Sequence, residues 1–324
     1  MSSAGLTDRP AAGPSTTGES PRGVLPTPQD RPTNPWLRRL FWINLVVEVL
    51  IVVTGGLVRL TGSGLGCPTW PRCTDASLTP QRHEALGIHT YIEFGNRTLT
   101  SVVGGVALAL LIATWRWAPH RKGLRLPIAL VLVGIAVQAV VGGISVRMDL
   151  NPAIVATHFL VSMLLVMASA WLVWREREGD GAPVPVVRRE VRLLSYAVAA
   201  LALVILVLGT MVTGSGPHSG DADEPARLGI DPRTISWLHA DTVMLFIGLV
   251  VAVLVAVRIS TDDRVARRSW LVLLGVTLAQ GAVGYTQYFT GLPWVVVLVH
   301  MLGASLLVVA TTWAVLSLRH RPAA

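Results

Sequence analysis

The sequence predicts an all-α integral membrane protein with eight transmembrane helices, built as two parallel four-helix bundles related by a pseudo-twofold axis. Three observations lead to this fold class. The chain of 324 residues is 52% hydrophobic and only 14% charged, whereas about a quarter of the residues of a soluble chain are charged. Eight apolar runs are long enough to cross a bilayer, and one glutamine–histidine motif occurs twice.

The eight apolar runs define the helices. A transmembrane helix needs about 20 mainly apolar residues, and helices suit a bilayer because hydrocarbon offers no partner for free backbone groups. The runs cover residues 40–58, 92–115, 126–146, 153–174, 193–212, 235–257, 270–289 and 294–316.

An internal repeat relates the two parts of the chain. Gln138 and His158 stand 20 residues apart, and so do Gln280 and His300. Small residues follow each glutamine, and a turn containing a proline comes before each histidine. A repeat of this length indicates duplicated structural units. We expect the glutamines to form hydrogen bonds between helices.

The repeat also fixes the domain organisation. We assign residues 36–174 and 193–318 to the two bundles, joined by a cytoplasmic linker at 175–192. Residues 1–35, rich in Pro, Ser, Thr and Gly, predict a disordered cytoplasmic tail, and residues 319–324 form a second tail. Because each half has an even number of helices, the repeats should be parallel rather than inverted.

The net charge of +8 reflects membrane orientation. One set of helix ends carries seventeen arginines and lysines, whereas the alternate loops hold six: Arg59, Arg72, Arg82, Arg147, Arg227 and Arg233. The positive-inside rule then places both termini in the cytoplasm. This distribution explains the basicity without a nucleic-acid partner.

Three histidines are candidate haem ligands. His158, His239 and His300 each lie near the outward start of a helix, and two imidazoles facing one another across a bundle can hold a haem iron. Small residues at 142–143, 281 and 284 would let a flat macrocycle approach the helices. The alternative for any one of them is a hydrogen bond between helices.

One helix carries a carboxylate near its outward end. His89, Glu93 and Asn96 share a face, and Asn96 aligns with His239 of the other half. Arg97 follows Glu93 by four residues and is its expected partner. Glu93 is therefore either a structural ion pair or a proton-handling group. Glu48 is another carboxylate inside a span, and such groups usually have a functional reason.

Two cysteines, Cys67 and Cys73, lie in the first outward loop. On that face they can form a disulfide, although a redox-active pair is equally compatible with the spacing. A zinc site is the weakest reading because no second pair of ligands is near. Four other histidines are expected in solvated loops or the tail: His83, His120, His218 and His320.

Several segments together resemble the heme A synthase family. They are GGLVRLTGSGLGCPTWPRC at 55–73, IEFGNR at 92–97, the two Gln…His hairpins and LVHMLGAS at 298–305. The resemblance covers nearly the whole chain after residue 35. It implies oxidation of the C8 methyl of haem O to the formyl group of haem A, for cytochrome oxidase biogenesis. It also implies a multi-pass protein of the cell membrane, with haem sites toward the extracytoplasmic face and haem O synthase as a partner.

The resemblance also assigns roles to residues. His239 and His300 would hold a haem b cofactor, and His158 would hold the substrate haem O beside the catalytic Glu93. Cys67 and Cys73 would match the outward disulfide of the family.

One residue departs from the family pattern. Asn96 stands where the family has a histidine, three residues after the glutamate. The first-half haem is then either five-coordinate on His158 or bound by His89, with Arg97 close by. Two rival functions use the same histidines: a non-catalytic membrane haem carrier and an electron-transfer cytochrome b.

Overall fold

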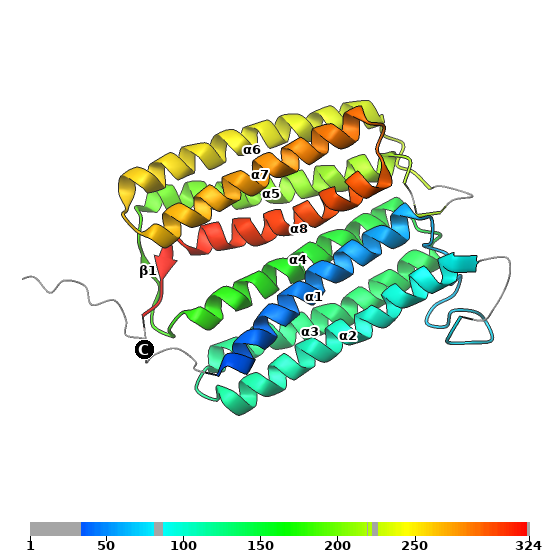
Figure 1. The fold of residues 1–324 in the computed structure, drawn as a ribbon, viewed down its shortest axis with the longest axis horizontal. Coiled ribbons are helices and arrows are strands. Elements are labelled where there is room, and N and C mark those ends of the chain that lie inside the picture. Colours follow the sequence, from blue (N-terminus) through cyan, green and yellow to red (C-terminus); the bar gives the residue numbers. More distant parts are fainter. Residues whose placement is uncertain (1–33, 81–86, 219, 222–225, 323–324) are drawn as a thin grey trace, which may run out of the picture.

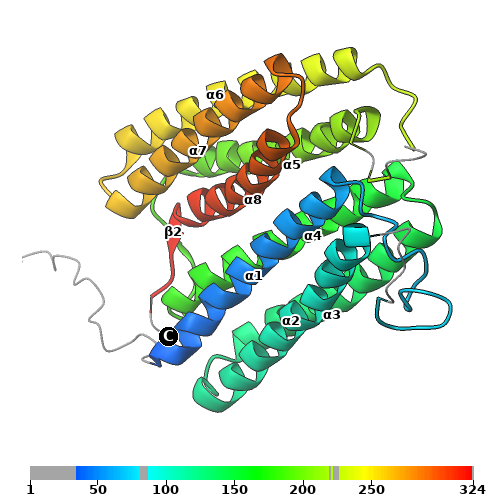
Figure 2. The same cartoon turned by 45° about the vertical axis from the view of Figure 1, so that its right-hand side comes forward.

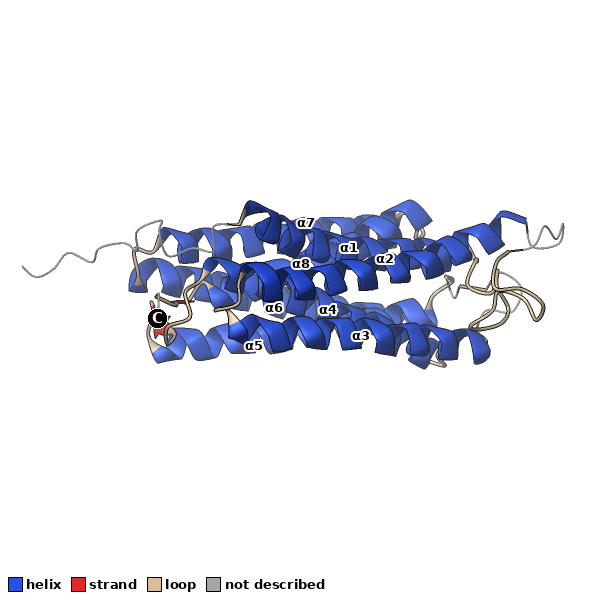
Figure 3. Ribbon diagram, turned by 90° about the horizontal axis from the view of Figure 1, so that it is seen from below, coloured by secondary structure: helices blue, strands red, loops and turns tan. Residues whose placement is uncertain are grey.

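The computed structural model describes residues 34–80, 87–218, 220–221 and 226–322. It contains eight long helices that run along the length of the molecule (Figure 3), and all eight are long and apolar enough to span a membrane. The eight predicted spans are thus confirmed. In chain order the helices are α1 (Pro35–Leu60), α2 (Gly87–Trp117), α3 (Lys122–Arg147), α4 (Pro152–Arg177), α5 (Arg189–Ser215), α6 (Pro232–Ser260), α7 (Arg264–Phe289) and α8 (Trp294–Leu316).

Several helix starts follow directly from local sequence. Asn34, Asn151 and Asp231 each accept a hydrogen bond from a backbone N–H of the first turn, and a proline follows each of them. Asparagine and aspartate satisfy the free N–H groups at a helix start, and proline is favoured at the first helical position. These pairs begin α1, α4 and α6.

The helices form two groups, α1–α4 and α5–α8 (Figure 1). In the first group α1 packs against α2, α2 against α3, α3 against α4 and α4 against α1. The second group repeats this order from α5 to α8 and back to α5. Consequently α2 faces α4 across the first group, and α6 faces α8 across the second.

α8 joins the two groups, because it packs against α1 and α4 as well as α5 and α7 (Figure 2). The Trp313 indole donates a hydrogen bond to the Ala170 carbonyl of α4, at 2.9 Å, and packs edge-to-face on Trp42 of α1. The apolar core of the first group includes Val308 and Val309 of α8. The halves therefore share one continuous packed interface.

The two ends of the molecule differ. One, which we call the long-loop end, carries the loops after α1 and α5 and the tight turns after α3 and α7. There, the two long loops lie against each other: the Gly64 N–H of the first loop donates to the Gly220 carbonyl of the second at 3.0 Å. Arg59 donates to the Thr213 and His218 carbonyls and fixes the second loop.

At the opposite, terminal end α1 begins and α8 ends. Residues 319–320, expected in a tail, form strand β2 (Arg319–His320), which pairs antiparallel with β1 (Val184–Pro185) of the linker. Linker and C-terminal segment are thus attached to each other. Residues 1–33, predicted to be disordered, lie outside the described residues, as do 323–324 of the predicted tail.

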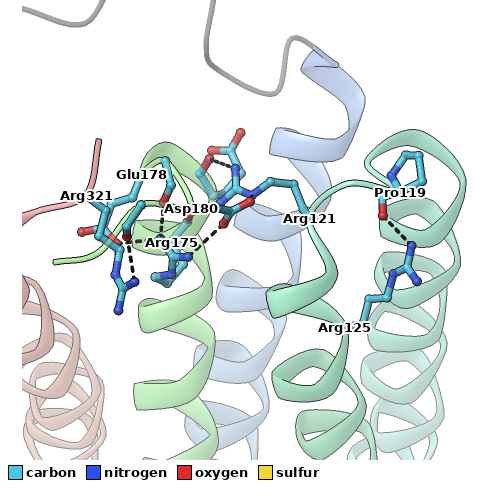
Figure 4. Close-up of polar contacts among 10 residues, drawn as sticks. Pro119, Arg121, Arg125, Arg175, Glu178, Asp180 and Arg321 are labelled. Atoms are coloured by element: carbon cyan, nitrogen blue, oxygen red, sulfur yellow. Dashed lines mark hydrogen bonds and ion pairs between the residues drawn. The ribbon is translucent and has the colours of Figure 1, made fainter. Parts of the chain in front are cut away.

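A polar network fastens this end (Figure 4). Arg121 and Arg175 both pair with Asp180, at 3.0 and 3.2 Å, and Arg175 also pairs with Glu178. Arg321 lies 3.9 Å from Glu178. Burial lowers the pKa of the Arg121 guanidinium, and Asp180 opposes that shift. The network links the α2–α3 turn, the linker and the C-terminal segment.

Candidate functional site

The three candidate ligands lie near the long-loop end. His158 and His300 are each the seventh residue of their helices, α4 and α8, and His239 is the eighth residue of α6. The Nδ1 atom of each imidazole is buried and has no hydrogen-bond partner among the described residues. His239 and His300 stand on the diagonal helices α6 and α8, so their side chains lie on opposite walls of the second group.

Each imidazole rests on a glycine of the preceding helix. A Cβ atom built on Gly142 would lie 3.3 Å from Cε1 of His158, and one on Gly284 would lie 3.3 Å from Cε1 of His300. On Gly209 the corresponding distance to His239 is 3.4 Å. Contacts this short leave little room for a side chain, so the glycines set the position of the rings.

Asn96 occupies the fourth position of this pattern. A Cβ built on Gly55 of α1 would lie 3.9 Å from Nδ2 of Asn96 on α2. Every odd-numbered helix thus presents a glycine to a polar side chain of the next helix, and three of the four side chains are imidazoles. The Asn96 side-chain oxygen accepts a hydrogen bond from Thr54 Oγ1 at 2.7 Å.

The small residues that were expected to leave room for a macrocycle have different neighbours within each pair. Of the glycines in α7, Gly284 contacts the ligand, whereas Gly281 has nothing within 4 Å. Gly142 contacts His158, but Gly143 faces the Trp70 ring. Only one glycine of each predicted pair therefore supports an imidazole.

The repeated glutamines bind the histidine backbone. Gln138 Nε2 donates to the His158 carbonyl at 2.8 Å, and Gln280 Nε2 donates to the His300 carbonyl at 2.7 Å. Ser162 accepts a second bond from Gln138. The predicted hydrogen bonds between helices are confirmed for both.

Glu93 is buried, and both of its carboxylate oxygens accept hydrogen bonds. Its Oε2 accepts from the Cys67 backbone N–H at 2.6 Å, and its Oε1 accepts from Arg97 Nε at 3.0 Å. Arg97 also donates to the carbonyls of Cys67 and Thr69, each at 2.8 Å. The expected Glu93–Arg97 pair is confirmed, and it is bound to the loop as well as to α2.

That loop covers the α2–α3 side of the first group. Cys67 and Cys73 form a disulfide. Trp70 lies on Gly143, and its carbonyl accepts from Arg147 at 2.7 Å. The loop therefore reaches α3 within one residue of the glycine that supports His158.

His89 lies on the side of α2 that faces the loop after α1. Its side chain is exposed, and its Nδ1 lies 2.8 Å from Ser63 Oγ, within hydrogen-bond distance. His120 and His320 are exposed as expected. His218 is different: its Nε2 bonds the Leu292 carbonyl at 3.1 Å and is partly buried, because the second loop folds over the α7–α8 turn. His83 lies outside the described residues.

Comparison with known proteins gives the family. A family model described as cytochrome oxidase assembly protein matches residues 38–218, which is more than half of the chain. The chain belongs to this family. It is 26% identical to heme A synthase of Bacillus mycoides over 285 residues, covering 83% of this chain and 90% of that one. It is 24% identical to heme A synthase of Staphylococcus epidermidis over 279 residues, covering 82% and 91%. The resemblance seen in the sequence is confirmed.

The residues of this site fit a haem. Imidazoles are common axial ligands of haem iron, and those here have buried, unpartnered Nδ1 atoms and each lies beside a glycine. Among the described residues, no three His, Cys, Asp or Glu side chains gather as a metal site.

Sequence reasoning missed Gly55, Gly209 and Trp70 in this family member. The two glycines precede their partners by 41 and 30 residues, so no short motif joins them. The internal repeat could have indicated these two glycines, because α1 and α5 precede a ligand-bearing position in the same way as α3 and α7 do.

Proposed function

We propose that this protein is a heme A synthase, an oxidoreductase that converts the C8 methyl of haem O to the formyl group of haem A for cytochrome oxidase. One observation carries this: three imidazoles and Asn96 rest on equivalent glycines at one end of two helix groups, and Glu93 lies one turn from Asn96. The relatives named heme A synthase, which match over most of both chains, support it.

The two halves have different tasks. In the half at 193–318, His239 and His300, on diagonal helices, would hold haem b. In the half at 36–174, His158 would bind the substrate haem O, and Asn96, on the diagonal helix α2, would not be a ligand. We favour His158 as the only protein ligand of this haem over additional ligation by His89, because the His89 imidazole is exposed and lies within hydrogen-bond distance of Ser63.

The chain contributes proton handling and exclusion of water. Bound haem b would supply electron transfer. Glu93 takes up protons released as the methyl carbon is oxidised, and the Cys67 N–H and Arg97 hold its two oxygens in place. Of the two paired side chains, Glu93 is the proton carrier, because the guanidinium of Arg97 is not deprotonated in proteins. The disulfide loop shields this carboxylate, and preorganised donors of this kind need no rearrangement during the reaction.

The orientation follows from charge. Both termini lie in the cytoplasm, the halves are related by a pseudo-twofold axis along the membrane normal, and the long-loop end with both haem sites faces the outside of the plasma membrane. Support comes from the excess of arginine and lysine at the terminal end and from the disulfide at the long-loop end. Substrate would arrive from haem O synthase within the lipid.

The decisive experiment extracts pigments from membranes that contain this protein and a supply of haem O. The wild type should yield haem A. Glu93→Ala and Glu93→Gln should retain bound haem but lose haem A, whereas Glu190→Gln, at an exposed carboxylate of α5, should behave as the wild type.

Two rival outcomes are distinguishable. A carrier would return haem O unchanged from wild-type protein, and an electron-transfer cytochrome would show two low-spin haems and no formyl product. Wild-type amounts of haem A from Glu93→Ala would remove that residue from the reaction.

A further inference from the structure

Glu48 is a buried carboxyl group that the proposed chemistry does not use. It lies in the middle of α1, the residue is 3% exposed, and its Oε1 is buried without a hydrogen-bond partner. None of the described residues forms an ion pair with it. An unpaired charge in a bilayer-spanning helix is costly, and such groups usually have a function.

The helices around Glu48 offer no charge at its level. α1 packs against α2, α4 and α8, and the titratable side chains of all four helices lie toward the two ends. They are Arg38, Arg39 and Arg59 of α1; His89, Tyr91, Glu93, Arg97 and Arg116 of α2; His158, Arg175, Glu176 and Arg177 of α4; and His300 of α8. The middle of this interface therefore holds one ionisable group.

Two contacts locate Glu48 relative to the haem site. Asn44, one turn away on the same face of α1, donates to Ser169 Oγ of α4 at 2.9 Å. From that bond, with 1.5 Å per residue along two antiparallel helices, Glu48 lies about 10 Å along the axis from His158. Gly55, two turns beyond Glu48 on the same face, marks the level of Asn96 at about the same distance.

Polar side chains lie on both sides of Glu48 along the helix axes. Ser162 and Gln138 both bind the His158 carbonyl, and Ser162 lies about 4–5 Å along the axis from the level of Glu48. Asn44 Oδ1 and Gln138 Oε1 are buried acceptors without partners. Uncompensated acceptors call for a donor, such as a protonated carboxyl group or a water molecule.

We propose that Glu48 is a redox-linked proton-binding site, which takes up a proton when the haem held by His158 is reduced and releases it on oxidation. This rests on the proposed function, because it requires haem at His158. Reduction adds one negative charge to the iron, and a group at this distance in a medium of low dielectric constant responds to it. In the redox titration described below, the electron comes from the added chemical reductant and the proton from the buffer. Since proton uptake then accompanies reduction, the midpoint potential must fall as pH rises.

The experiment titrates the potential of the purified, haem-loaded protein at several pH values. The first-half haem is identified as the component that is absent from His158→Ala. In the wild type its potential should fall with pH, by at most about 59 mV per unit for one proton per electron. Glu48→Gln, which keeps the shape but cannot exchange a proton, should abolish most of this slope. Glu48→Asp should retain it, and Glu190→Gln serves as the matched control.

A second readout does not depend on potentials. The redox-induced infrared difference spectrum should contain a carboxyl carbonyl band that shifts in D2O and is absent from Glu48→Gln. An unchanged slope together with an unchanged carboxyl band in Glu48→Gln would overturn the inference while leaving the proposed function intact. If Glu48→Gln does not fold, a wild-type spectrum without such a band overturns it instead. A colourless wild-type protein would overturn the proposed function first.

Discussion

The Gln280 side chain reaches from α7 to the backbone carbonyl of His300 on α8 and binds it at 2.7 Å. Gln138 makes the same bond to His158 at 2.8 Å. These carbonyls already lie inside helices, so the glutamine amide adds a donor from the neighbouring helix at the level of each imidazole. Each bond joins the helix that carries the histidine to the preceding helix, and it does so at the histidine itself.

Replacing this glutamine should loosen the haem. In Gln280→Met the chain length is kept and the donor is lost, at a cost of about 1 kcal/mol for a hydrogen bond between membrane helices. That corresponds to roughly fivefold weaker haem retention, measured as the rate of haem loss to an excess of a haem-binding acceptor. Gln138→Met should affect the first-half haem alone. Equal loss rates in wild type and both variants would show that the bonds do not position the ligands.

The glycine contacts predict a sharp difference within one helix. Gly284→Ala adds a methyl group about 3.3 Å from His300 Cε1, whereas Gly281→Ala, one turn away, meets nothing within 4 Å. Alanine favours helix by about 1 kcal/mol over glycine in both variants, so propensity cancels. We expect Gly284→Ala to lose or shift the haem b absorbance and Gly281→Ala to keep it. Similar spectra for both would contradict the role of Gly284 as support for the ring.

The substitution Asn96→His should add a second protein ligand to the first-half iron. Asn96→His puts an imidazole on the position that His158, His239 and His300 occupy on their own glycines. The first-half iron should then change from a five-coordinate, high-spin state to a six-coordinate, low-spin state, which electron paramagnetic resonance detects. A high-spin signal that persists in Asn96→His would mean that this side chain does not face the iron.

Removing the disulfide should lower haem A formation more than it lowers haem b binding. Cys67→Ser with Cys73→Ser opens a short loop, worth about 2 kcal/mol in chain entropy, and frees the backbone that binds Glu93 and Arg97. We expect haem A formation to fall at least severalfold while bound haem b stays near the wild-type amount, since His239 and His300 lie in the other helix group. A parallel loss of both would point to general unfolding.

Much of this could be predicted because its signals lie along the chain. Apolar runs identified all eight helices, and equal 20-residue spacings identified both Gln–His pairs. The Gly209–His239 contact could not be predicted, since it depends on how α5 and α6 are rotated. Nor could the bond between Glu93 and the Cys67 N–H, because a loop conformation decides which backbone group meets a carboxylate 26 residues away. The strand pairing of residues 319–320 with the linker left no periodic pattern either.

The position of α8 has a consequence for any attempt to divide the molecule. This helix packs against α1 and α4 as well as its own neighbours, and Met301, next to His300, lies against Gly56 of α1. A gene fragment that encodes one half would leave the shared face of α8, or the groove it fills, open to lipid. Two fragments separated within the linker should therefore be complementary when co-produced, and each alone should be cleared by membrane proteases.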